Sequence, residues 1–237
     1  MASIFTPTTW PTVLGPYAID VNDCIGDSVG IINANTNYLA SYTAAVSSIA
    51  STQINTLSSL IYTPPAGGIL EYLSNPCDGS IIVGRSGSYT WPNVTAVQNI
   101  STVTYTNVSG SFISYVPPAG ATKVIYKFQY AHSFIDADAL LHYNFFIDSN
   151  EVQYARYNTR AQSYFENRAT FEWSIGIGGT PNINTGRLAS WTTPKILKLM
   201  SRAYTTDYQG RLHTTSNWNG AGTDMFSMPV LTIIATT

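Results

Sequence analysis

The chain is poor in charge, in cysteine and in long apolar runs. Charged residues make up only 10% of its 237 residues, whereas about a quarter is usual in soluble domains. The formal net charge is −2 and no run of lysine or arginine occurs, so the sequence argues against nucleic acid as a partner. No window approaches the ~18 apolar residues of a membrane helix, and we expect no membrane span.

The two cysteines, Cys24 and Cys77, are too few for a disulfide framework. They flank a predicted helix, and we expect two free thiols in a chain made in a reducing cytoplasm. The N-terminus lacks a basic region followed by an apolar stretch, so a secretory signal is not expected. A protein that is made in the cytoplasm without a secretory signal and works outside the cell leaves the cell inside a particle.

Residues 25–62 carry the most informative pattern of the chain. Apolar side chains recur every seven residues, with others about halfway between, and the phase shifts by a four-residue step after Val46. Such a stripe predicts a helix that packs on copies of itself, with a local unwinding of the supercoil at the shift. The stripe consists of Ile25, Ile32, Leu39, Tyr42, Val46, Ile49, Ile54, Leu57 and Ile61. We therefore predict a short coiled-coil stalk over residues 24–62.

The flanks of this helix are made of serine, threonine, asparagine and alanine, and residues 28–70 contain no charged side chain. A helix of this kind is weak by itself, which favours a stalk shared by several chains. The alternative is an amphipathic helix packed on the rest of its own chain. Gly26 and Gly30 weaken the first turns, so we expect the helix to start near Ile31. The proline and glycine residues of 64–68 end it.

Residues 1–23 are predicted to form an extended arm, because Pro7, Pro11 and Pro16 exclude a long helix. The arm is apolar without the period of a helix or a strand. Its apolar residues include Phe5, Trp10, Leu14, Tyr17 and Ile19. We expect it to anchor the protein to another surface, and the alternative is a first strand of the following domain.

Residues 63–237 predict a β head. Apolar and polar side chains alternate in 122–130 and 168–177, and 141–157 indicates a hairpin. Many short strands separated by glycine, asparagine and proline turns favour a jelly-roll-like antiparallel sandwich. The fold class expected is therefore mainly β, behind one N-terminal helix. The motif of residues 62–67 recurs at 115–120, which indicates either a subdivision near 116 or one turn used twice.

Residues with catalytic or metal-binding spacing are missing from the sequence. Neither an HExxH nor a CxxC motif occurs, nor a GxSxG elbow or a phosphate loop. His132 and His142 share a metal only if a turn at 135–138 brings them together. We therefore predict no enzyme, no metal and no cofactor.

Segment 202–226 is rich in tyrosine, tryptophan and asparagine, which together recognise carbohydrates and proteins. The candidate surface-binding residues are Tyr204, Tyr208, Arg211, Asn217 and Trp218. The alternative places these aromatic rings in the core and on strand faces.

Four segments carry a resemblance to a known family. They are 113–128 (ISYVPPAGATKVIYKF), 141–148 (LHYNFFID), 152–156 (VQYAR) and 171–173 (FEW). Together they resemble structural proteins of tailed phages of cyanobacteria and other aquatic hosts, and related segments occur in large algal viruses. The resemblance implies a trimeric virion fibre, knob or decoration protein, without catalytic residues to carry over.

The function expected is thus a virion structural protein. It is a homotrimeric spike, made in the host cytoplasm, that binds other virion proteins through its arm and displays its head. Its placement on the tail or on the capsid stays open, and a host-surface glycan is a further partner. The polar residues Ser28, Asn35 and Thr56 of the predicted helix do not discriminate between a dimer and a trimer. The alternatives are a stand-alone carbohydrate-binding lectin and a glycan hydrolase or lyase.

Overall fold

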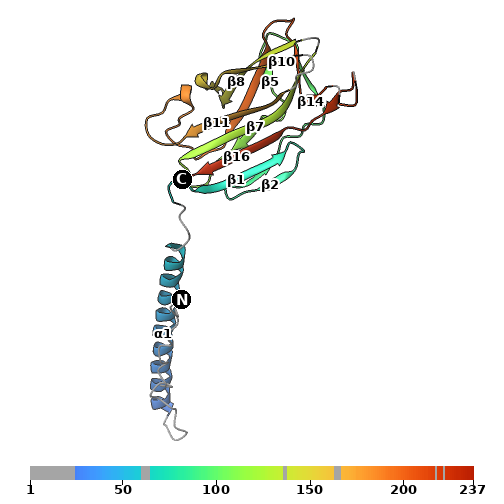
Figure 1. Cartoon of the computed structure of the whole chain (residues 1–237). Coiled ribbons are helices and arrows are strands. Elements are labelled where there is room, and N and C mark those ends of the chain that lie inside the picture. The colour runs from blue at the N-terminus through green and yellow to red at the C-terminus, as the bar shows by residue number, and fades with distance from the viewer. Residues whose placement is uncertain (1–24, 60–64, 136–137, 163–166, 217, 221) are drawn as a thin grey trace. The chain divides into compact units, whose positions relative to one another are not determined.

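The computed structural model describes residues 25–59, 65–135, 138–162, 167–216, 218–220 and 222–237 (Figure 1). One helix precedes many antiparallel strands, which confirms a mainly β chain with a helix near its N-terminus. The chain divides into two compact units, Met1–Thr63 and Pro64–Thr237. The predicted arm lies outside the described residues, with Phe5, Trp10, Leu14, Tyr17, Ile19 and also Cys24.

Helix α1 runs from Ile25 to Ser59 and has 35 residues, a length of about 52 Å at 1.5 Å per residue. The expected start near Ile31 is wrong, because the helix already includes Gly26 and Gly30. A glycine costs about 1 kcal/mol in a helix. Helix formation is cooperative, and the many residues that follow extend it through both glycines.

The hydroxyl groups on α1 bond to the helix itself. Ser41 Oγ donates to the carbonyl of Asn37 at 2.7 Å, and Thr43 Oγ1 to that of Leu39 at 2.8 Å. Ser51 and Thr52 bond in the same way to the carbonyls four residues before them. This pattern is common for serine and threonine inside helices. The polar flank of α1 is therefore partly satisfied without charged groups.

The rest of the described chain contains sixteen strands and two short 3₁₀-helices, joined by turns and loops. The strands are β1 Ile69–Pro76, β2 Ile81–Val83, β3 Ser88–Thr90, β4 Gln98–Ile100, β5 Thr106–Asn107, β6 Ile113–Tyr115, β7 Lys123–Phe134, β8 Asp138–Ile147, β9 Asn150–Glu151, β10 Tyr157–Gln162, β11 Asn167–Gly176, β12 Lys195–Ala203, β13 Gly210–Leu212, β14 Thr214–Thr215, β15 Met225–Phe226 and β16 Val230–Thr236. The 3₁₀-helices are η1 Gln153–Ala155 and η2 Ile183–Thr185. The strands predicted from alternation are present as β7 and β11, and the hairpin as β8 with β9 and β10.

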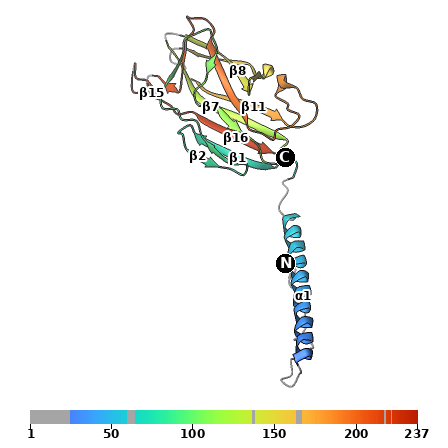
Figure 2. The ribbon, with the colours of Figure 1, turned by 180° about the vertical axis from the view of Figure 1, so that it is seen from behind.

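The long strands form two antiparallel sheets. The first sheet has the order β1-β16-β7-β13-β4, with β11 on the other side of β7, and the second has β10-β8-β12-β5, with β6 on β12. Figures 1 and 2 show β7, β16 and β1 side by side. The sheets face each other through aromatic rings, with Tyr126 5.0 Å from Phe145 and Phe145 5.2 Å from Phe171 between ring centroids.

The core between the sheets is rich in tyrosine. Tyr126 is fully buried and its hydroxyl donates to the carbonyl of Ser111 at 2.6 Å. The hydroxyls of Tyr130 and Tyr157 lie 2.9 Å apart and share a hydrogen bond. A buried tyrosine needs such a partner. Many of the tyrosines outside segment 202–226 therefore belong to the core.

The repeated proline motif forms the same turn at both of its positions. The amide of Gly68 donates to Pro65 O at 2.7 Å, and that of Ala121 to Pro118 O at 3.2 Å. The glycine before each donor has a positive φ, 81° at Gly67 and 87° at Gly120, which a type II turn requires at this position. Residues on both sides of 116 pair within the same two sheets, in one compact unit.

Candidate functional site

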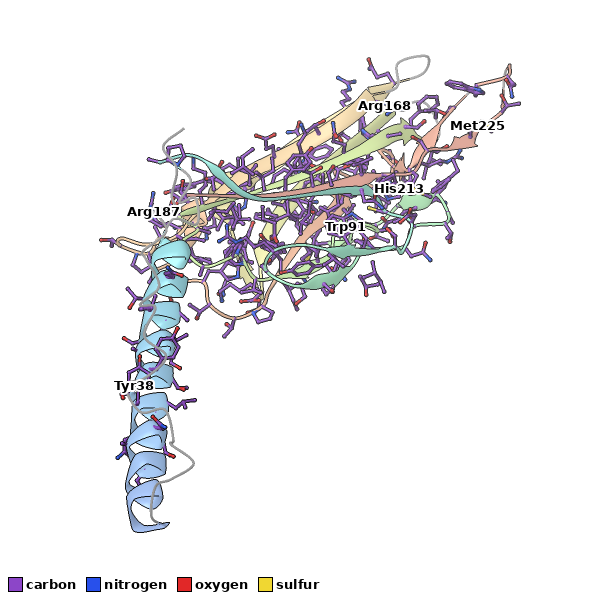
Figure 3. All side chains as sticks on the ribbon, turned by 90° about the horizontal axis from the view of Figure 1, so that it is seen from below. Tyr38, Trp91, Arg168, Arg187, His213 and Met225 are labelled. Carbon is purple, nitrogen blue, oxygen red and sulfur yellow. The ribbon has the colours of Figure 1, made fainter. Side chains whose placement is uncertain are left out.

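Four side chains of the predicted apolar stripe are exposed on helix α1. Leu39, Tyr42, Val46 and Ile49 keep 64%, 44%, 48% and 57% of their surface exposed, and Tyr38 beside them 49% (Figure 3). The side chains of the other stripe residues, Ile25, Ile32, Ile54, Leu57 and Ile61, lie outside the described ones. Large apolar residues at this spacing on a solvent-exposed helix are the first candidate interaction surface.

A second candidate surface lies on the outer face of the second sheet. The strand register places Asn158 of β10, His142 of β8 and Arg202 of β12 side by side in one row across the sheet. Side chains alternate along a strand, and the neighbours Tyr143 and Ser201 are fully buried in the core. The row therefore faces outward.

A pocket of about 190 Å³ opens on this face, which we call the sheet-face pocket. It is lined by Tyr105, His142, Tyr143, Asn144, Arg156, Tyr157 and Asn158. Asn144 is only 8% exposed, and its side-chain amide makes no hydrogen bond among the described residues. An amide can both donate and accept hydrogen bonds, so a ligand in the pocket can pair with it.

The charge of this face is determined by Arg202, His142 and Arg156. Arg202 donates to His142 Nδ1 at 3.3 Å, and its guanidinium lies 5.4 Å from the centre of the Tyr105 ring. Arginine is only a donor, so Nδ1 of His142 accepts and its Nε2 carries the proton. Burial, and then the charge of Arg202, lower the pKa of His142. Arg156 is paired with Glu151 through two bonds of 2.6 and 2.9 Å.

The five predicted surface-binding residues fall into two groups. Tyr204 lies beside the sheet-face pocket, 5.6 Å from the His142 ring and 5.9 Å from the Tyr208 ring. Arg211, on β13 of the first sheet, forms an ion pair with Asp224. Trp218 is 68% exposed. Among the described residues no hydrogen bond, ion pair or ring contact joins these two groups, and Asn217 lies outside the described residues.

The histidines considered for a metal site lie on different strands and in different surroundings. His132 is fully buried, and neither of its ring nitrogens has a hydrogen-bond partner among the described residues, as is also true of His213. His142 is part of the outer face. Where the structure describes the chain, no three His, Cys, Asp or Glu side chains are grouped as metal ligands.

No helix within the described ranges has the length and hydropathy of a membrane span.

Cys77 is a free, fully buried thiol on the way from β1 to β2. Its sulfur lies 3.5 Å from the carbonyl oxygen of Gly110, to which it donates. Burial raises the pKa of the Cys77 thiol to about 12. Reactivity requires the thiolate, so this cysteine is a packing residue.

Sequence reasoning missed most of the sheet-face pocket. The hairpin 141–157 was predicted, and its pairing sets Asn158 opposite His142. Tyr105, and Arg202 beside the pocket, come from segments far away in the chain, and their approach depends on the pairing of β12 with β8 and with β5. The short-range pattern contains no signal for that pairing, while the alternation in β8 does show that His142 and Asn144 share a face.

Comparisons with known proteins find only distant likeness. No family model matches the chain, and no curated protein matches its sequence. Solved structures of infectious bursal disease virus are similar at 10% identity, with TM-scores of 0.24 for both the Gt and the Gx strain. They cover 74% and 63% of this chain, and the chain spans only 59% and 42% of theirs.

Proposed function

We propose that this protein is a virion structural protein, a homotrimeric spike in which the helices associate and the head is displayed. The observation that carries the proposal is the exposed stripe of Leu39, Tyr42, Val46 and Ile49 on α1. Burying such a stripe against copies of the same helix removes apolar surface from water. The number of three chains and the display on a virion are what the resemblance to phage fibre and decoration proteins implies, and the placement on the tail or on the capsid stays open.

The strand order supports a jelly-roll head. The order β1-β16-β7-β11 faces β6-β12-β8-β10, which gives eight main strands in two antiparallel sheets. Jelly rolls of this kind occur in viral capsid proteins and in lectins. Since one fold serves many functions, this argument from analogy favours both a virion role and a lectin role.

In this proposal residues 1–23 anchor the spike to other virion proteins, and the protein is made in the host cytoplasm. The proposal includes no catalysis. The residues that line the sheet-face pocket are aromatic, amide and basic side chains without a carboxylate pair, and glycosidases use such a pair.

The test is the solution mass of the full chain by light scattering, with a variant that carries Leu39→Asp and Val46→Asp. Each aspartate would bury an unpaired charge in the helix seam, so we expect a trimer that dissociates to monomers. The matched control carries Ala44→Asp and Ser51→Asp, which add the same charges seven residues apart on the other side of the helix. We expect the control to remain a trimer.

A dimer would correct the number of chains, and a monomer in the unmodified protein would refute the shared stalk. A chain that lacks residues 1–62 separates two further cases. Loss of the trimer in this variant assigns assembly to the N-terminal part, and a trimer in it assigns assembly to the head and contradicts the stalk.

The second candidate is a stand-alone lectin, which the sheet-face pocket favours. A stand-alone lectin binds its saccharide as a monomer, so its binding needs neither the helix nor a second chain. Deletion of residues 1–62 therefore leaves its binding to a glycan-coated surface unchanged, whereas a trimeric spike loses the gain from simultaneous contacts.

A further inference from the structure

We infer that the sheet-face pocket binds one saccharide unit that carries an anionic group. The inference starts from three features: an arginine beside the pocket without an acidic partner among the described residues, an asparagine of the pocket wall whose amide makes no hydrogen bond to those residues, and an exposed tyrosine ring at the pocket's edge. Each recognises a different part of such a ligand. The binding itself does not depend on the trimer, and its biological use rests on the proposed display of the head.

The anionic group is recognised by the cations of this face. Arg202 forms no ion pair with a carboxylate among the described residues, and its contacts are His142, Tyr105 and a backbone carbonyl. Lys198, in the same strand and on the same face, lies over the Phe146 ring at 5.7 Å and likewise lacks an acidic partner there. An arginine fork binds carboxylates and phosphates through two parallel hydrogen bonds.

The acids near the pocket leave this positive charge in place. Glu151 is engaged by Arg156 through both of its oxygens, and Asp138 by Arg160. Both acids are thus balanced by an arginine of their own. His142 donates only through Nε2, because Nδ1 accepts from Arg202. The net surplus of positive charge on the face therefore comes from Arg202 and Lys198.

The hydroxyl groups of a sugar are recognised by the two amides. Asn144 is 8% exposed and lines the pocket with its hydrogen-bonding groups free among the described residues. Asn158 lines the same pocket from β10 and is exposed. An amide offers both a donor and an acceptor, which matches the mixed character of hydroxyl groups.

The size of the pocket and the ring beside it limit the ligand further. Its volume of about 190 Å³ lies below the ~300–1,000 Å³ of pockets that hold drug-sized ligands, so it admits a single ring. Tyr204 is 49% exposed next to His142. Its ring gives the next unit of a chain an apolar face to rest on. The ligand is therefore a unit of a longer acidic saccharide.

The experiment is a titration of the full-length protein, followed by calorimetry and by ligand-observed NMR. The carboxylated probes are methyl glucuronide, methyl galacturonide and N-acetylneuraminate, and the phosphorylated probe is glucose 6-phosphate. Methyl glucoside and methyl galactoside are the neutral counterparts, and inorganic phosphate is the anion without a sugar. We expect saturable binding of a carboxylated or a phosphorylated probe, at least tenfold tighter than that of the neutral sugars. Which of the two classes binds identifies the source of the anion.

Two variants locate the binding. Arg202→Gln removes the unpaired cation, and Asn144→Asp keeps the size of the side chain while adding a negative charge that repels the ligand. We expect each to weaken binding at least tenfold. Arg168→Gln is the matched control, because Arg168 is an exposed arginine of β11 in the first sheet (Figure 3), and we expect a change of less than twofold. Unchanged melting temperatures show that the variants fold.

Four results would overturn the inference. They are no saturable binding of any charged probe, equal binding of the neutral sugars, equally tight binding of inorganic phosphate, and equal losses in Arg168→Gln and Arg202→Gln. The variant with Leu39→Asp and Val46→Asp separates this inference from the proposed function. If that variant is monomeric and binds the probe with the same affinity per head, saccharide binding by the sheet-face pocket is independent of the proposed trimer.

Discussion

The hydroxyl of Tyr115 donates a hydrogen bond of 2.6 Å to Oε2 of Glu71, inside the head and between strands 44 residues apart. Glu71 is 6% exposed and also accepts from the amide and the hydroxyl of Ser86, at 2.8 and 2.7 Å. Burial, and then Glu71, raise the pKa of Tyr115, so Tyr115 remains a donor. The buried acid thus ties β1 to β6 and to the loop that contains Ser86.

Removing this donor destabilises the head. We expect Tyr115→Phe to lower the free energy of unfolding by about 1.5–3 kcal/mol, because a buried carboxyl oxygen loses one of its partners. Urea denaturation followed by tryptophan fluorescence measures the change. Tyr154→Phe is the control, since Tyr154 is 65% exposed and we expect no measurable effect. Equal stability of the two variants would show that the Glu71 bond contributes nothing.

Two glycines with the same backbone conformation predict different costs of substitution. Gly110 and Gly120 have φ values of 81° and 87°, so an alanine at either position pays about 1–2 kcal/mol of backbone strain. A Cβ at Gly110 would also lie 2.8 Å from Val94 Cγ2, whereas nothing lies within 4 Å of one at Gly120. We expect Gly110→Ala to cost about 1–3 kcal/mol more than Gly120→Ala in urea denaturation. Equal costs would exclude the close contact at Gly110.

The helix provides a prediction about concentration. A helix without charged pairs and with an exposed apolar stripe gains most of its stability from association. We expect the temperature at which the helical circular dichroism of the full chain is lost to rise with protein concentration. The variant with Leu39→Asp and Val46→Asp should lose this dependence. A melting temperature that is independent of concentration in the unmodified protein would contradict a shared helix.

The parts of the fold that sequence patterns predicted are those with local causes. The alternation of Tyr126 and Phe128 predicts a half-buried strand, and the seven-residue recurrence of Leu39 and Val46 predicts a helix. The start of that helix was misjudged, because the local cost of Gly30 was given more weight than the cooperativity of the residues that follow.

The parts that could not be predicted depend on pairing between distant segments. Arg202 reaches His142 only because β12 pairs with β8, and Glu71 reaches Tyr115 because β1 and β6 lie in facing sheets. Acidic side chains are usually exposed, so the sequence composition does not predict the burial of Glu71. The candidate site therefore appears only once the sheets are assembled.

The two buried histidines make the head sensitive to acid. Burial lowers the pKa of His132 and that of His213 to about 4, from an unfolded value near 6.5. Between these pH values the unfolded chain binds more protons than the folded one, so stability falls as the pH falls. The stabilising contribution is complete above pH ~6.5 and lost by pH ~4. A pKa difference of about 2.5 amounts to roughly 3 kcal/mol for each histidine at 1.36 kcal/mol per unit.

Replacement of one of these histidines isolates its part of the effect. His132 lies in β7, where leucine fits the backbone, whereas His213 has a φ of 65° that disfavours leucine. We expect His132→Leu to reduce the loss of unfolding free energy between pH 6.5 and 4.5 by about half, measured by urea denaturation at a series of pH values. His142→Leu is the matched control on the outer face of β8, and we expect a much smaller change because its imidazole is only partly buried. A loss that is the same in His132→Leu and the unmodified protein would mean that groups other than the buried imidazoles cause the acid sensitivity.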